Sequence, residues 1–501
     1  MAINSVNYGA SILSQAVSNI NSQLSELQTQ LTSGKKSTTY AGMGINEGFA
    51  IAARAQLSNI SAFSDTMSNI NTYINVANTG LQSIVDIGTT VQNGANSTSQ
   101  DIKASGQTTA QLTANAQLSS MLGILNMQAG DRYLFSGSAV NTPSVADMDT
   151  ILNGTTTQAG LKTVISERQQ ADLGTSGMGR LVVTSPTPTS VALGEDVAGS
   201  PFGMKLSAVS STLTGATVTG PAGSPANISV NLGAGNPNDG DKISFAFTMP
   251  DGTSESIDLT ASSANPPPAG SFAISATPTA TAANLNAALT TAIGNLANTT
   301  LVAASAIRAG SDFFDEPPQR VGTTPLGSAT TLVAGTPANT VSWYTGNPGP
   351  TASARASATA RVDQSVTVQY GAQADEPAIR RQLQTLAVFS AVTTSPTNPN
   401  GAAQVSALSQ RVAQNLAPQP GQQTIEDIQA DFAAAQTSMK DATARQKQTQ
   451  GMLQNMVDSA EGISSDQVAS QILALQTNLQ ASYQTTAMLS QLSLTKYLPV
   501  G

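Results

Sequence analysis

The sequence lacks the two residue types on which most enzymatic and metal sites depend. None of its 501 residues is Cys or His, and only 4% are aromatic and 10% charged. His is the usual general base and metal ligand near neutral pH, and Cys is the usual thiolate nucleophile and soft ligand. Without Cys there is also no disulfide framework. We therefore expect no catalytic residues, no metal site and no cofactor.

The charge balance and the hydropathy pattern exclude two further classes of protein. The net charge is −9, whereas a nucleic-acid-binding protein normally carries a basic face. No apolar run approaches the ~20 residues that a membrane-spanning helix needs. The first residues, MAINSVNYGASILSQ, have neither the basic nor the continuous apolar segment of a secretory signal. We expect no nucleic-acid partner, no membrane contact and no cleaved signal peptide.

The prolines divide the chain into three zones. None precedes Pro143, and all but Pro418, Pro420 and Pro499 lie in residues 142–400. The flanking zones are rich in Ala, Gln, Ser, Asn and Leu, which favours helices. The middle is rich in Pro, Gly, Thr and Val, with turn clusters such as NPNDGDK. This predicts an α+β multidomain protein, in which long helices from both termini form a coiled-coil rod and β-rich domains occupy the centre.

Both N-terminal helices are predicted by apolar residues that alternate four and three positions apart. This spacing is typical of a coiled-coil seam, because it keeps one stripe facing a partner helix. The first stripe consists of Val6, Ala10, Leu13, Val17, Ile20, Leu24, Leu27 and Leu31. The second consists of Phe49, Ala53, Gln56, Ile60, Phe63, Met67, Ile70, Ile74, Ala77, Leu81, Ile84, Gly88 and Val91. Gln56 and Gly88 are weak positions in a helix of about 60 Å.

The C-terminal zone repeats this pattern. Thr424 can cap a helix whose stripe is Ile425, Ile428, Phe432, Ala435, Met439 and Ala442. The stripe then passes through polar Gln446 and Thr449 and recovers at Leu453 and Met456. After a break, a last helix carries Val468, Ile472, Leu475 and Leu479, and then an apolar set that includes Leu489 and Leu492. The sequence does not decide which of these two sets determines the register of the last helix.

A polar, glycine-rich break separates the two N-terminal helices. Its glycines, Gly34, Gly42, Gly44 and Gly48, predict a hinge. The terminal helices have hardly any charge, since Glu26 is the one charged side chain in residues 1–34. Soluble surface helices normally carry many charges on the outer face. Two interpretations remain open: packing between subunits, with the ends ordered on assembly, or an isolated bundle with an uncharged polar coat.

The break LTSGKKSTTYAGMGINEGFAIAARAQLSNI (31–60) resembles the bacterial flagellin family. Flagellins end their first helix with Leu-(Ser/Thr)-(Ser/Thr)-Gly-(Lys/Arg) and start the second with a Gly-Leu-Ala-Ile-Ala-like run. The first run is matched by Leu31, Thr32, Ser33, Gly34 and Lys35, and the second by Gly48, Phe49, Ala50, Ile51 and Ala52. Phe49 stands where the family usually has Leu. The resemblance extends over both helical zones.

Two other segments resemble the hook–filament junction protein of the same superfamily. They are AGDRYLFSG (129–137), which looks like the entry to a β-hairpin, and the tail LSLTKYL (492–498). The long variable centre is more similar to a filament subunit. A secreted adhesin or enzyme on a coiled-coil stalk is a third interpretation.

The resemblance implies a subunit of the extracellular flagellar filament, exported by the flagellar type III apparatus and serving motility. Its implied partners are further copies of itself, an export chaperone, and the cap and hook-associated proteins. The implied domains are inner-core helices at 1–33 and 463–501, a connector at 34–48, outer-tube segments at 49–140 and 401–462, and a surface-exposed region at 141–400. The implied self-assembly seam is Val6, Leu13, Val17, Ile20, Leu24, Leu27, Leu31, Val468, Ile472, Leu475, Leu479, Leu489 and Leu492. The implied outer-tube packing residues are Phe49, Ile60, Phe63, Met67, Ile70, Ile74, Leu81, Ile84, Ile425, Ile428, Phe432 and Met439.

The central zone offers weaker signals. ISFAFTMPDGTSESIDLT (243–260) alternates apolar and polar residues around a Pro-Asp-Gly turn, which predicts a hairpin. Short amphipathic helices are predicted at ANLNAALTTAIGNL (283–296) and after Pro377. GNPNDGDK (235–242) has the oxygen ligands of a calcium loop but lacks its spacing, so we predict a plain turn.

Overall fold

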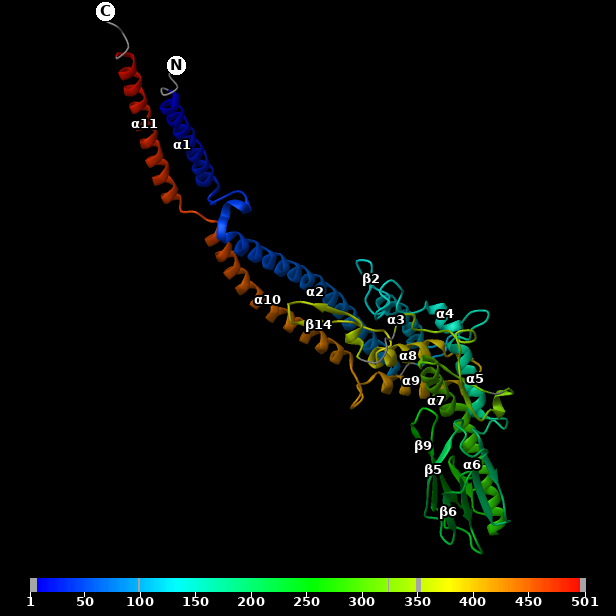
Figure 1. The fold of residues 1–501 in the computed structure, drawn as a ribbon. Helices are drawn as coiled ribbons and strands as arrows, with labels where there is room; N and C mark the ends of the chain where they lie inside the picture. Colours follow the sequence, from blue (N-terminus) through cyan, green and yellow to red (C-terminus); the bar gives the residue numbers. More distant parts are fainter. Residues whose placement is uncertain (1–6, 98–99, 323, 348–352, 496–501) are drawn as a thin grey trace, which may run out of the picture. The chain divides into compact units, whose positions relative to one another are not determined.

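The structure of the protein, a computed structural model, describes residues 7–97, 100–322, 324–347 and 353–495, with side chains from residue 12 to residue 488. It is a mixed α/β protein with long helices and several small sheets (Figure 1). The long helices are α1 (Asn7–Ser33), α2 (Glu47–Ala95), α10 (Ile425–Glu461) and α11 (Ser465–Thr495). The shorter ones are α3 (Thr109–Leu125), α4 (Met148–Asn153), α5 (Leu161–Leu173), α6 (Pro278–Leu296), α7 (Val302–Phe314), α8 (Pro377–Ala391) and α9 (Gly401–Leu416).

The chain forms two compact units, and the boundary between them falls inside α2 and α10. The first unit comprises residues 1–69, 360–368 and 436–501, and the second comprises residues 70–359 and 369–435. This differs from the predicted limits near residues 140 and 400. The reason is that the later turns of α2 belong to the packing of the second unit: Gly80 lies against Ile124 of α3, and Gly88 lies against Gln382 of α8. Gly88, a weak position in the stripe, is therefore a place of close approach.

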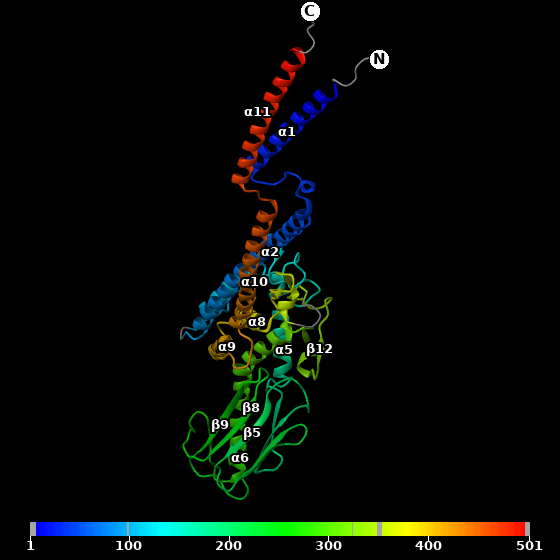
Figure 2. The ribbon, with the colours of Figure 1, turned by 60° about the vertical axis from the view of Figure 1, so that its left-hand side comes forward.

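In the first unit, α1 and α11 lie side by side and run antiparallel, so the first turn of α1 and the last turn of α11 are at the same end of this pair (Figures 1 and 2). The α2 and α10 segments of this unit share a small apolar core. It consists of Ala53, Leu453 and Val457, with Leu57 and Ile60 packed against it.

The structure corrects the predicted packing of Phe49. Its side chain is 65% exposed, whereas Ala50 and Ala53 are buried. Counted from Ala50, the inward stripe of α2 continues through Ala53 and Leu57, so it begins one residue later than the predicted one. The α10 stripe shifts in the same way, since Val457 is buried and Met456 is 49% exposed.

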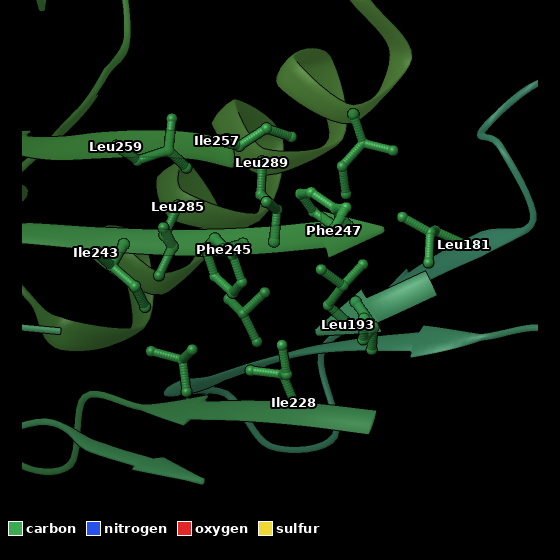
Figure 3. Packing of buried hydrophobic residues seen from close by; sticks show 14 of the residues in the cluster. Leu181, Leu193, Ile228, Ile243, Phe245, Phe247, Ile257, Leu259, Leu285 and Leu289 are labelled. Carbon is green, nitrogen blue, oxygen red and sulfur yellow. The ribbon is translucent and has the colours of Figure 1, made fainter. Parts of the chain in front are cut away.

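The β-rich part of the second unit has two four-stranded sheets that enclose one core with α6. One sheet has the strand order β3-β4-β7-β6 and the other β10-β9-β8-β5, with β10 and β9 parallel and the other neighbours antiparallel. Their bounds are β3 (Leu181–Thr184), β4 (Ser190–Glu195), β5 (Lys205–Ser211), β6 (Thr217–Ala222), β7 (Asn227–Asn231), β8 (Lys242–Thr248), β9 (Ser254–Ser262) and β10 (Ser271–Ala273). Figure 3 shows Phe245 of β8, Leu285 of α6 and Ile228 of β7 meeting in this core.

The predicted hairpin and the predicted short helices are confirmed. β8 buries alternate residues, among them Phe245 and Phe247, and turns at Gly252 into β9. A single π-turn, η2 (Ala297–Leu301), joins α6 to α7, so this helix continues from the sheet core into the helical part of the unit. Three two-stranded sheets complete the structure: β1 (Gln128–Ala129) with β2 (Arg132–Tyr133), β11 (Gln319–Val321) with β12 (Leu332–Ala334), and β13 (Thr359–Arg361) with β14 (Thr367–Gln369).

Gly310 marks a close approach of α7 and α8, and we expect Gly310→Ala to destabilise the second unit. A Cβ atom there would lie 2.4 Å from Cγ2 of the buried Val388. Alanine favours the helix by about 1 kcal/mol, but overpacking a buried contact costs about 1–3 kcal/mol. The expected net loss in the free energy of unfolding, measured in urea, is the difference between these effects, up to about 2 kcal/mol.

Gly123→Ala is the matched control for this prediction. Gly123 also lies inside a helix, α3, but it is exposed, and a Cβ atom there would have no neighbouring atom within 4 Å. We expect this variant to be stabilised by up to about 1 kcal/mol. The double variant Gly310→Ala/Val388→Ala should lack the steric clash. If Gly310→Ala has the same free energy of unfolding as Gly123→Ala, the clash does not exist.

Candidate assembly site

The apolar stripes of α1 and α11 face each other but remain partly uncovered. Leu13, Val17, Ile20, Leu24 and Leu27 of α1 are half-buried, and none of the described side chains of this helix is fully buried. On α11, Val468 is fully buried, whereas Ile472, Leu475 and Leu479 are half-buried. One helix covers only one side of its partner. The seam residues therefore keep apolar surface for further contacts.

Some predicted seam residues fall elsewhere. Leu31, two residues before the end of α1, is 41% exposed. Val6 lies outside the described residues. Leu489 and Leu492 belong to α11, but their side chains also lie outside the described part of the chain.

More apolar surface lies beside the seam. Ile12 on α1 and Leu473 on α11 are 65% and 64% exposed. Between the two helices, a cavity of about 460 Å³ is lined by Leu27, Ala474 and Leu475 together with Glu26 and glutamines. The first turn of α1 has no acidic residue and its last turn has no basic one, so no charge offsets the helix dipole. Both helices therefore leave apolar side chains exposed.

The predicted outer-tube residues are mostly interior. Ile60 and Phe63 are half-buried, and Phe49 is exposed as described above. The buried ones are Met67, Ile70, Ile74, Leu81, Ile84, Ile425, Ile428, Phe432 and Met439. Gln446, the polar residue that interrupts the α10 stripe, is also buried. Its Nε2 donates a 2.7 Å hydrogen bond to the Val362 carbonyl, which satisfies the amide. A side-chain amide thus fills the gap in the apolar pattern.

The break between α1 and α2 pairs with the break between α10 and α11. Residues 34–36 lie against residues 461–463. The Lys36 N–H donates to the Glu461 carbonyl (2.7 Å), and the Ile463 N–H donates to the Gly34 carbonyl (3.1 Å). The Lys36 ammonium donates to the last carbonyls of α10, at Ser459 and Ala460. We call this pair of segments the arm bridge. The sequence predicted a break here but not the backbone pairing, because hydrogen bonds between main chains leave no residue pattern.

The four predicted hinge glycines have different roles. Gly34 and Gly44 have φ of +65° and +61°, which favours glycine. Gly42 lies in the short helix η1 (Tyr40–Asn46), where a Cβ would lie 2.2 Å from the Ser37 hydroxyl. Gly48 is the second residue of α2 and has free space around it, so it is not a hinge residue. The predicted connector thus ends at Asn46, not at residue 48.

Glu461 fastens the arm bridge from the side. Its carboxylate accepts from Arg54 Nε and Nη2 at 2.7 and 2.6 Å, and lies 3.3 Å from the Lys35 ammonium. The Glu461 side chain is 4% exposed, whereas Arg54 and Lys35 are 43% and 47% exposed. The hydrogen bonds from Arg54 lower the pKa of Glu461, with a further contribution from Lys35.

We expect the arm bridge to open in acid. Because the pKa of Glu461 is lowered in the folded state, its stabilisation is complete above the ordinary Glu pKa of 4.5 and is lost as the pH falls through the lowered value. Hydrogen bonds to a charged group contribute about 1.5–3 kcal/mol, so the Lys36 and Ile463 amides should exchange at least tenfold faster when the carboxylate is neutral. Glu461→Gln should show this at pH 7, whereas Glu426→Gln, on an exposed turn of the same helix, should not. Equal protection in both variants would show that the carboxylate does not hold the bridge.

The AGDRYLFSG segment forms the tight hairpin β1–β2 in the second unit. Gly130 at its turn has φ of +68°, and the guanidinium of Arg132 lies 5.9 Å from the Tyr73 ring and 5.6 Å from the Tyr370 ring. Phe135 is fully buried. The segment therefore joins the end of α3 to Tyr73 of α2 and to Tyr370.

The calcium-like segment is a turn held by its own carboxylates. Asp241 accepts from the Thr214 and Asn238 amides, both at 2.8 Å, and Asp239 accepts from the Ser263 amide at 2.6 Å. These hydrogen bonds lower the pKa of both groups. The segment forms the predicted turn, at residues 239–240.

Three negative findings narrow the interpretation. Across the described part of the chain, no three acidic side chains converge as metal ligands. No helix in the described ranges combines the length and apolar character needed to cross a membrane. No protein-family model and no curated protein matches the sequence. The features that bear on function are therefore the long helices α1, α2, α10 and α11 and the arm bridge.

Proposed function

We propose that this protein is a structural subunit that polymerises into the bacterial flagellar filament and thereby serves motility. The observation that carries the proposal is the half-exposed, nearly chargeless stripe on both α1 and α11. Two amphipathic helices alone leave apolar surface in water, and neighbouring copies can cover it. The flagellin-like motif at residues 31–60 supplies the identity of the polymer.

In this proposal the two ends of the chain form the coiled-coil rod of the filament. The helices at 1–33 and 463–501 line the inner core, and those at 49–140 and 401–462 form the outer tube. Residues 141–400 face outward. A filament requires a heterologous contact that does not close on itself, so the surface used on one copy differs from the surface it meets on the next.

The arm bridge has a defined role in this arrangement. It joins the two breaks, so that α1 and α11 are tied together at one end and can be covered as a pair. The protein acts outside the cell, is exported by the flagellar type III apparatus without a cleaved signal, and has no enzymatic activity, metal or cofactor. Its partners are copies of itself, an export chaperone, and the cap and hook-associated proteins.

The test removes apolar surface from the seam. Burying a Leu or Ile side chain contributes about 1.5–3 kcal/mol, and each 1.4 kcal/mol changes an equilibrium constant tenfold. Ile20→Asn together with Leu27→Asn should therefore raise the critical concentration for polymerisation at least about 100-fold. Sedimentation and electron microscopy of the purified protein, seeded with filament fragments, measure it.

Val333→Asn is the control for the seam variant. Val333 is apolar and 46% exposed, and it lies on β12 in the region proposed to face outward. Its polymerisation should equal that of the unaltered protein. Normal filaments from the seam variant, or from a protein lacking residues 1–33, would refute the proposal.

The hook–filament junction protein is the second candidate. The β1–β2 hairpin in AGDRYLFSG favours it, because this segment resembles that group. The two functions differ in abundance. In purified flagella, a filament subunit makes up most of the protein mass, whereas a junction protein is present in few copies; quantitative mass spectrometry distinguishes them.

A further inference from the structure

The second unit contains a cavity of about 250 Å³, separate from the one between α1 and α11. Its walls come from residues 85–92 of α2, residues 378–382 of α8, the segment 415–418 at the end of α9, and the start of α10 at 424–426. One water needs about 10–15 Å³ of such space, and sites for drug-sized ligands begin near about 300 Å³. The cavity is therefore large enough for a small organic molecule.

One cation, Arg381, lines this cavity, and it has no carboxylate partner among the described residues. Its guanidinium donates to the side-chain oxygen of Gln422 and, at 3.1 Å, to the carbonyl of Gln423. Burial lowers the pKa of this half-buried guanidinium. A guanidinium has more N–H donors than these two hydrogen bonds use, and its planar geometry fits a carboxylate. Arg381 can therefore receive a carboxylate from outside the chain.

One carboxylate, Glu426, also lines the cavity; it is exposed and forms no ion pair within the described ranges. Two side-chain amides lie in the same lining. Nε2 of Gln92 donates to the Ala413 carbonyl at 3.0 Å, and Nε2 of Gln382 donates to the Ile84 carbonyl. In the part of the chain that the structure describes, no group donates to the oxygen of either amide. These oxygens and the Glu426 carboxylate are acceptors suited to an ammonium group.

The rest of the lining is mostly apolar, with Val85, Leu416 and Ile425 among its side chains. The carboxylate of Asp427, next to Glu426 in the sequence, is already engaged in the cap of α10, where it accepts from the Thr424 N–H at 2.8 Å. The cavity therefore combines one positive charge, one negative charge, neutral oxygen acceptors and an apolar surface.

We propose that this cavity binds a free α-amino acid with an aliphatic side chain. The carboxylate of the ligand pairs with Arg381, its ammonium group with Glu426 and the amide oxygens of Gln92 and Gln382, and its side chain lies against the apolar lining. A ligand with a single charge satisfies one of the two charged residues and is repelled by the other, whereas a zwitterion satisfies both. This site does not depend on the polymerisation proposed above.

Equilibrium dialysis of the full-length protein against radiolabelled L-leucine tests the site. We expect saturable binding of one molecule per chain. Arg381→Gln should weaken this binding at least about tenfold, because it removes the charge-assisted hydrogen bonds to the carboxylate. Glu426→Gln should weaken it about two- to fivefold, a smaller effect because Glu426 is exposed and solvent screens its charge.

Two analogues of leucine separate the roles of the charged residues. Isoamylamine lacks the carboxylate, and isocaproate lacks the ammonium group. Both should compete with labelled leucine for the unaltered protein, but more weakly than unlabelled leucine does. Competition by isocaproate should become weaker in Arg381→Gln and not in Glu426→Gln. Competition by isoamylamine should become weaker in Glu426→Gln and not in Arg381→Gln.

Arg361→Gln is the matched control. The Arg361 guanidinium also donates to carbonyls of a turn, those of Asp363 and Gln364, but it lies outside the cavity, so leucine binding should stay unchanged. If Arg381→Gln does not fold, Glu426→Gln and the two analogues still decide, because the Glu426 side chain is exposed. The absence of saturable leucine binding by the unaltered protein, or analogues that respond equally to both variants, would overturn the proposal.

Discussion

Replacement of Arg168 by Ala should lower the free energy of unfolding of the second unit by about 3–5 kcal/mol, because it leaves the buried carboxylate of Asp172 without a cation and that of Asp312 with the half-exposed Arg308 alone. Arg168 Nε lies 2.9 Å from Asp172, and Nη1 lies 2.9 Å from Asp312. Its Nη2 donates to the Pro201 carbonyl, and the guanidinium lies 4.9 Å from the centre of the Phe202 ring. Both carboxylates and the guanidinium are at most 3% exposed.

Arg308→Ala provides the comparison for this prediction. Arg308 also pairs with Asp312, at 2.9 Å, but its side chain is 41% exposed. Solvent screens such a pair, so we expect a loss of about 1 kcal/mol or less. Urea unfolding followed by far-UV circular dichroism and by Trp343 fluorescence measures both variants. Losses of similar size would mean that Arg168 does not hold the buried acids.

Phe245→Ala should remove a similar amount, about 3–5 kcal/mol, by opening a cavity between the sheets. Phe245 is fully buried in β8, at the place where α6 and both sheets meet (Figure 3). The side chains of this core come from several strands of both sheets and from α6, so they cannot close the space without moving the sheets or the helix. The same urea titrations measure the loss.

Two substitutions calibrate the core prediction. Phe245→Leu keeps most of the volume and should be clearly milder than the alanine variant. Val182→Ala, at a side chain that is 45% exposed in β3, should change the stability by less than about 0.5 kcal/mol. A loss below about 1 kcal/mol for Phe245→Ala would show that this core is not closely packed.

The long helices were predictable because their signal is local. Apolar residues three and four apart predicted α1, α2, α10 and α11, and alternation around a Pro-Asp-Gly turn predicted the β8–β9 hairpin. Even here the predicted start of the α2 stripe was one residue too early. Phe49 and Ala50 are both apolar, so their spacing alone does not decide which of them is buried. The structure buries Ala50 and leaves Phe49 exposed.

The buried ionic contacts were not predictable, because their members are far apart in the sequence. Arg168 and Asp312 are separated by 144 residues, and Arg411 reaches Asp251 across 160. A charged residue inside an amphipathic helix normally indicates the solvent face. Only the fold shows that these arginines connect α5 and α9 to other parts of the second unit.

The candidate site shows the same division. Its apolar seam was visible in the sequence, whereas its fastening was not, since the arm bridge uses main-chain groups and one acid. No residue pattern around Glu461 in the sequence indicates that it forms ion pairs. Its importance appears only when Lys35 and Arg54 converge on it in space.

The arm bridge also sets an order of events during synthesis. Arg54 and Glu461 are separated by 407 residues, and ribosomes release the N-terminal part of a chain first. Residues 34–36 are therefore synthesised long before residues 461–463, with which they pair. Both sheets and the helices around them are made in between. A chain that stops between residues 369 and 461 contains every strand described above, but its first helix lacks its partner segment, so the bridge distinguishes chains that reach residue 463 from shorter ones.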